Sequence, residues 1–185
     1  MTKKKVIFLG DDFGRPTGWS IVAKNLISNL DNSWIYEAYF ARGKIKENTE
    51  IKSAGILLSY RERSKNLLII LDLISLILNL RFSKIKTIHC LAEPYIPVAF
   101  LLAVIYRADL ICTIYGTHSV IPHETKYKKI YEKAFTHAKK ISCISNYTKR
   151  RFLETWGNNF SNVEVVYIGC DQKTFKHKIE LEKEN

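Results

Sequence analysis

The most constraining feature of this chain is that short apolar runs alternate with longer segments of helical periodicity. Each run is only a few residues long and ends near a glycine or a polar residue. Continuous apolar runs of this kind are typical of parallel strands that are covered on both faces. The sequence therefore predicts an α/β fold with a doubly wound, mainly parallel, Rossmann-like sheet in a single domain. About seven strands are expected, at residues 5–10, 35–40, 55–59, 85–91, 110–115, 141–144 and 163–167.

The segments between the runs have the three- and four-residue spacing of amphipathic helices. One helix is predicted to begin near Trp19, and Ser145 is predicted to cap another that runs to Trp156. Two more are expected at residues 95–108 and 125–140. Strands and helices thus alternate along almost the whole chain.

Residues 66–80 are the most apolar segment, interrupted only by Asp72, Ser75 and Asn79. These three lie at helical spacing and would form one narrow polar stripe. The 14 residues from Leu67 to Leu80 make a helix roughly 21 Å long, which is shorter than the ~30 Å core of a bilayer. A buried helix is the main prediction, and a helix that also rests on a membrane or a partner is the alternative.

The charge balance points to an anionic partner. The chain has 29 Lys and Arg against 18 Asp and Glu among 185 residues, a formal net charge of +11. Such an excess favours a nucleic acid, an anionic membrane surface or a phosphorylated substrate, although it also serves solubility alone. The basic residues are spread along the chain, whereas nucleic-acid binding usually needs one basic stripe or arm. Nucleic acid is therefore the least favoured partner.

The cysteines and the N-terminus predict a cytoplasmic protein. Cys90, Cys112, Cys143 and Cys170 form no C-x-x-C pair and lie in or beside apolar runs, so they are expected to be buried thiols in a reducing compartment. They do not suggest a metal site. The apolar run at residues 6–9 is too short for a signal peptide.

In a sheet of this kind, ligands bind beyond the carboxyl ends of the strands. That rule selects residues 10–18, 92–97, 116–123, 145–151 and 169–171. His118 and Glu93 follow predicted strands and are candidates to meet a ligand, although a histidine with a purely structural role is the alternative.

Helix starts supply the remaining candidates. The glycine-rich loop that ends at Gly18 precedes a helix N-terminus, which favours an anion, but it lacks the G-x-G-x-x-G fingerprint and could be a plain turn. Asn146 and Lys149 lie at another helix start and suit a phosphate. A plain helix cap beside solvent-exposed charges would have the same residue types and is the alternative.

Four stretches of the chain, in this order, resemble the N-terminal domain of the family-four retaining glycosyltransferases. They are residues 5–10 with the loop to 17–20 (KVIFLG and TGWS), 88–94 (IHCLAEP), 112–118 (CTIYGTH), and 131–145 with 163–175 (YEKAFTHAKKISCIS and VEVVYIGCDQKTF). The resemblance implies the GT-B fold, in which two Rossmann-like domains face a cleft and the N-terminal one holds the acceptor. It also implies that Gly18 lies near the donor phosphates and that His118 lines the cleft near the transferred sugar.

On this resemblance, residues 1–175 are the acceptor-side domain, and residues 176–185 are a charged tail or the start of a linker to a missing C-terminal domain. That domain would bind most of the nucleotide sugar, the co-substrate, and no other cofactor is expected. It would also carry the family's two glutamates separated by seven residues. Glu124 and Glu132 have that spacing here, but we interpret the match as chance.

Two main hypotheses follow. The chain is expected to be the acceptor-binding half of a glycosyltransferase that acts on a glycan or lipid-linked acceptor, as in polysaccharide biosynthesis, and to need a donor-binding domain or subunit for activity. It would work as a peripheral protein at the inner face of the membrane. The alternative is a non-catalytic binding or assembly module that keeps the fold without transferring sugar.

Overall fold

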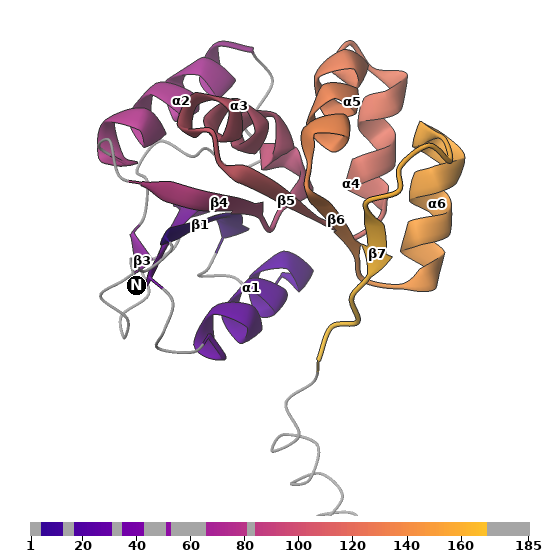
Figure 1. Cartoon of the computed structure of the whole chain (residues 1–185), viewed down its shortest axis with the longest axis horizontal. Coiled ribbons are helices and arrows are strands. Elements are labelled where there is room, and N and C mark those ends of the chain that lie inside the picture. Colours follow the sequence, from indigo (N-terminus) through magenta and orange to yellow (C-terminus); the bar gives the residue numbers. More distant parts are fainter. Residues whose placement is uncertain are drawn as a thin grey trace, which may run out of the picture.

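The computed structural model describes residues 5–12, 17–30, 35–42, 51–52, 66–80 and 84–169. Its strands form one parallel sheet in the order β3-β2-β1-β4-β5-β6-β7 (Figure 1). The strands are β1 (Lys5–Asp12), β2 (Ile35–Arg42), β3 (Ile51–Lys52), β4 (Ile85–Cys90), β5 (Asp109–Ile114), β6 (Lys140–Cys143) and β7 (Val163–Val165).

This architecture confirms the predicted parallel α/β fold. Six strands have three or more residues, and β3 adds only two at the edge of the sheet. The strand predicted at residues 55–59 lies outside the described residues. The chain places β2 and β4 on opposite sides of β1, so the direction of winding reverses there, as in a doubly wound sheet.

The helices start and stop where the sequence provides caps. The Thr17 hydroxyl accepts a hydrogen bond from the Ser20 amide and caps α1, and Ser145 caps α6 through the Thr148 amide, as predicted. The helices are α1 (Gly18–Ser28), α2 (Asn66–Leu80), α3 (Ile96–Tyr106), α4 (Thr117–Val120), α5 (Lys128–His137) and α6 (Asn146–Trp156), with 3-10 helices η2 (Glu93–Tyr95) and η3 (Ile121–Glu124). The helix predicted at 125–140 is shorter than expected because Ala138 is extended and Lys140 already begins β6. Glu124 and Glu132 therefore lie on different elements.

The two faces of the sheet carry different layers of helices. Helix α1 lies on one face, and α2, α3 and α5 lie on the other (Figure 1). Alternate residues of β1 point to opposite faces, so Val6 and Phe8 pack with α1 while Ile7 and Leu9 join the larger core. That larger core includes Phe135 and Phe152, whose rings meet edge to face with centroids 4.9 Å apart.

The apolar helix α2 is buried on one face only, so the main prediction of a buried helix holds for that face alone. Leu76 and Leu80 belong to the core. Ser75, expected in the polar stripe, is buried as well. The opposite face of α2, however, leaves 41–71% of each of four large apolar residues exposed, namely Ile70, Leu71, Ile74 and Leu78. Among the described residues, no helix is both long and apolar enough to cross a membrane.

Candidate functional site

The candidate site lies at the carboxyl edge of the sheet, where four predicted segments meet. The chain leaves β4 into η2, β5 into α4 and β6 into α6, while α1 begins six residues beyond the end of β1. This edge contains the position where the winding reverses, between β1 and β4. Ligands of doubly wound sheets bind beside such a switch point.

Tyr115 and Gly116, directly after β5, connect the segments of this edge. Their backbone amides both donate hydrogen bonds to Glu93 Oε1, at 2.9 and 3.0 Å. The Tyr115 ring meets the Trp19 ring of α1 edge to face, with centroids 6.4 Å apart. The Thr148 hydroxyl of α6 lies 3.5 Å from the Tyr115 carbonyl oxygen and donates to it. The turn that leads to His118 is thus held by η2, α1 and α6 together.

The turn itself depends on a glycine. Gly116 has φ of 136°, a backbone conformation that residues with a side chain rarely adopt. The amide and hydroxyl of Ser119 then both donate to the Gly116 carbonyl, at 3.1 and 2.6 Å. In turn, the Trp156 indole N–H of α6 donates to the Ser119 carbonyl at 2.9 Å. These bonds fix the backbone of α4, in which His118 is the second residue.

Glu93 is completely buried and belongs to the internal support of this turn. Burial raises the pKa of its carboxyl, and the amides of Gly116 and Tyr115 partly oppose that rise. The Tyr131 hydroxyl of α5 also donates to the Glu93 carbonyl oxygen, at 3.1 Å. In this structure the side chain contacts the Gly116 turn rather than solvent, so its part in the site is to position that turn.

The other sequence candidates lie at the same edge. Gly18 is exposed as the first residue of α1, and a Cβ placed on it would have no heavy atom within 4 Å. Asn146 is exposed at the start of α6 and donates to the Tyr167 hydroxyl at 3.0 Å. The positive charge of Lys149 counteracts the burial that raises the pKa of Cys143, at the end of β6, to about 12. The structure therefore brings all five candidates to one edge, each within the first four residues of a helix.

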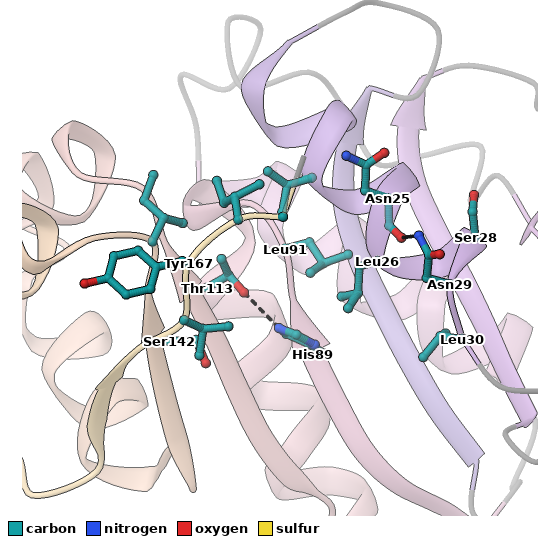
Figure 2. Close-up of a pocket in the computed structure, with 15 residues that line it drawn as sticks. Asn25, Leu26, Ser28, Asn29, Leu30, His89, Leu91, Thr113, Ser142 and Tyr167 are labelled. Atoms are coloured by element: carbon teal, nitrogen blue, oxygen red, sulfur yellow. Dashed lines mark hydrogen bonds between the residues drawn. The ribbon is translucent and has the colours of Figure 1, made fainter. Parts of the chain in front are cut away.

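A groove of about 770 Å³ adjoins this edge on the face of the sheet that carries α1 (Figure 2). Apolar and amide side chains of α1, including Leu26 and Asn25, form one wall, and residues 166–169 after β7 form the other. The floor contains three polar side chains, His89, Thr113 and Ser142, from the neighbouring strands β4, β5 and β6. No described helix covers this stretch, although a parallel sheet normally has both faces covered.

The floor residues were missed by the sequence analysis. His89 Nε2 lies 2.8 Å from Thr113 Oγ1, and burial lowers the pKa of His89 to about 4, so the ring is neutral near pH 7. Thr113 is in register with Ser142. A signal was present in the sequence, because each of the three is a polar residue between two apolar ones near the end of a strand. Within the described part of the chain, no three His, Cys, Asp or Glu residues are grouped to hold a metal ion.

Solved structures share this fold at low sequence identity. HepE of Anabaena, solved with UDP-glucose, matches with a TM-score of 0.64 and 14% identity over 96% of this chain and 50% of HepE. The lipopolysaccharide outer core galactosyltransferase WaaB matches with a TM-score of 0.61 and 15% identity over 88% of this chain and 45% of WaaB. A sucrose-phosphate synthase fragment from Thermosynechococcus elongatus matches at 0.61 and 10% identity, over 96% of both chains.

The chain thus spans about half the length of HepE and of WaaB. No curated protein sequence matches it. The model of Glycosyltransferase Family 4 matches residues 23–173, which include β4 to β7 and four of the five candidate residues. By fold and by sequence, the chain belongs to glycosyltransferase family 4.

Proposed function

We propose that this chain is the acceptor-side half of a glycosyltransferase that moves a sugar from a nucleotide sugar to a glycan or lipid-linked acceptor. The observation that carries the proposal is the convergence of the α1 N-terminus, the Gly116 turn and the α6 N-terminus at the switch point of a family-four domain. Such an edge is where sheets of this class bind ligands.

Each part of this edge has a chemical role in the proposal. The amides at the start of α1, beside the open space at Gly18, face the diphosphate of the donor, whose negative charge grows as the sugar leaves. His118, on the rigid turn after Gly116, forms a hydrogen bond to the transferred sugar or to the acceptor. Asn146 and Lys149 supply an amide and a cation at the start of α6. Glu93 holds the turn and touches neither substrate.

The donor would be held mainly by a second half, supplied by another domain or another subunit. Two observations support this: the chain spans half of HepE, and the sheet face beside α1 is left as an uncovered groove with partly apolar walls. We propose that a segment of the donor-binding half packs into this groove, against Leu26 and Tyr167.

The pair would work in the cytoplasm. The three buried free cysteines, Cys90, Cys112 and Cys143, suit a reducing cytoplasm.

The experiment is reconstitution. The chain is mixed or co-expressed with the donor-binding domain encoded in or beside its gene, and transfer is followed from radiolabelled UDP-glucose, UDP-galactose and GDP-mannose. The proposal expects transfer from one donor by the pair and none by the chain alone. Ser142→Phe, which fills the groove floor, should weaken the pairing, whereas Thr136→Phe on the exposed side of α5 should not.

A non-catalytic binding module is the second candidate, favoured by the uncovered groove beside α1, which could hold a partner without any turnover. It expects the chain to bind its partner or a glycan while no donor is turned over by any pair. The two candidates therefore differ in turnover and not in binding.

A further inference from the structure

An apolar surface on the helix layer has no role in the site described above. It begins on α2, where Ile70, Ile74 and Leu78 follow one another at four-residue steps, and Leu71 lies beside them. At 3.6 residues per turn, these four side chains lie within about 100° of one another around the helix axis. Between 41% and 71% of each is exposed. A stripe of this width would normally face a core.

The neighbouring helix α3 adds two more exposed apolar residues. The two helices lie against each other on the same side of the sheet (Figure 1), and the Tyr106 hydroxyl of α3 donates to the Ile77 carbonyl of α2 at 3.4 Å. Val104 and Ile105, near the end of α3, are 49% and 50% exposed. We call these six residues of α2 and α3 the apolar helix surface. Large exposed apolar areas on a folded domain mark interaction sites.

Basic side chains border one end of this surface. Both helices end at the amino edge of the sheet, where β4 and β5 begin. Lys84 and Arg107 are exposed there. Lys86 and Lys139 share a single carboxylate, Asp109, at 3.5 and 2.9 Å. Among the described residues at this border, four cations thus face one anion.

From this combination we propose that the apolar helix surface docks on an anionic membrane, with α2 lying in the plane of the headgroups. Ile74 and Leu78 enter the boundary of the acyl chains, and the basic border contacts acidic lipid headgroups. Charge decides between the possible occupants. A second copy of the chain would bring a second basic border and a second net charge of +11, whereas an acidic lipid surface neutralises both. The proposal concerns membrane binding alone and stands whether or not the chain transfers sugar.

The test is sedimentation of the full chain with vesicles of phosphatidylcholine, alone or with phosphatidylglycerol. The probe variant is Ile74→Glu, because Ile74 is 47% exposed on α2 and its loss leaves the core intact. The matched control is Ile21→Glu, because Ile21 is 49% exposed on another helix, α1. Circular dichroism confirms that both variants are folded, and size-exclusion chromatography gives their mass.

The proposal expects the wild-type chain to bind phosphatidylglycerol vesicles, and to bind them less tightly as salt is added. Ile74→Glu should weaken this binding about tenfold or more. Ile21→Glu should leave it within about twofold of wild type. Three results would overturn it. The first is that the wild-type chain stays in the supernatant at low salt. The second is equal binding by Ile74→Glu and Ile21→Glu, because the added negative charge alone would then explain the loss. The third is a dimer that Ile74→Glu dissociates while neither wild type nor variant binds vesicles, which would assign the surface to a second copy.

Discussion

Replacing Glu93 tests how the Gly116 turn is held. In Glu93→Ala, the Tyr115 and Gly116 amides lose the carboxyl oxygen that accepts both of them. An unsatisfied buried amide costs about 1–3 kcal/mol, so the pair predicts a loss of about 3 kcal/mol in the free energy of unfolding. For a domain of this size, that loss lowers Tm by roughly 10 °C. Glu93→Gln keeps an accepting oxygen and should cost about 1 kcal/mol.

The same variants test the charge state of Glu93. Because the pKa of Glu93 is raised in the folded protein above its ordinary 4.5, the folded state holds a proton that the unfolded state releases. This contribution to stability is therefore complete below pH 4.5 and is lost as the pH rises toward the folded pKa. The difference in unfolding free energy between wild type and Glu93→Gln should shrink or reverse over that range.

Urea denaturation at several pH values measures both effects, with Glu132→Ala as the control because Glu132 is exposed on α5. The reasoning is refuted if Glu93→Ala costs no more than Glu132→Ala. It is also refuted if Glu93→Gln is as damaging as Glu93→Ala at pH 5, since the site would then require a charged carboxylate.

Three further predictions concern His89 in the floor of the groove and the glycines Gly116 and Gly18. Burial lowers the pKa of His89 from 6.5 to about 4, so on acidification His89 takes up a proton in the unfolded state before it does in the folded state. Up to about 3 kcal/mol of stability present above pH 6.5 is therefore lost as the pH falls to 4. Urea denaturation of His89→Gln should show a weaker acid dependence than the wild type, and an equal dependence would contradict the assignment. Gly116→Ala should cost about 1–3 kcal/mol because of its φ of 136°, whereas Gly18→Ala should leave Tm almost unchanged. In the reconstituted pair, Gly18→Ala should still lower the rate of sugar transfer, by about tenfold. If the Gly18→Ala pair transfers sugar as fast as the wild-type pair, Gly18 is not part of the site.

Much of the fold could be predicted because its signals are local. The strands β1, β4, β5 and β6 are short apolar runs in the sequence, and Ser145 caps α6 as its residue type suggests. The end of α5 was misplaced because helical periodicity continues through Ala138 into Lys140, while pairing with β5 draws Lys140 into the sheet. Tertiary pairing overrides local periodicity at such a boundary.

The position of the candidate site could be predicted but not its detail. The rule about strand ends places Glu93 and His118 at the carboxyl edge of the sheet, where the structure has them, because each lies within four residues of the end of its strand. That Glu93 points inward depends on the amides of Tyr115 and Gly116, which lie 22 and 23 residues further along the chain. For a similar reason, the sequence offers an exposed face of α2 only as the alternative to a buried helix, since the sequence of an apolar helix is similar whether one or both of its faces are covered.

The most direct test of the central claim compares His118→Ala with His123→Ala in the reconstituted pair. His123 is the matched control because it lies five residues further on, in η3, where its ring contacts Trp156. The account predicts that sugar transfer falls about a hundredfold or more in His118→Ala and stays within about threefold of wild type in His123→Ala. Equal transfer by His118→Ala and wild type would contradict the proposed active site.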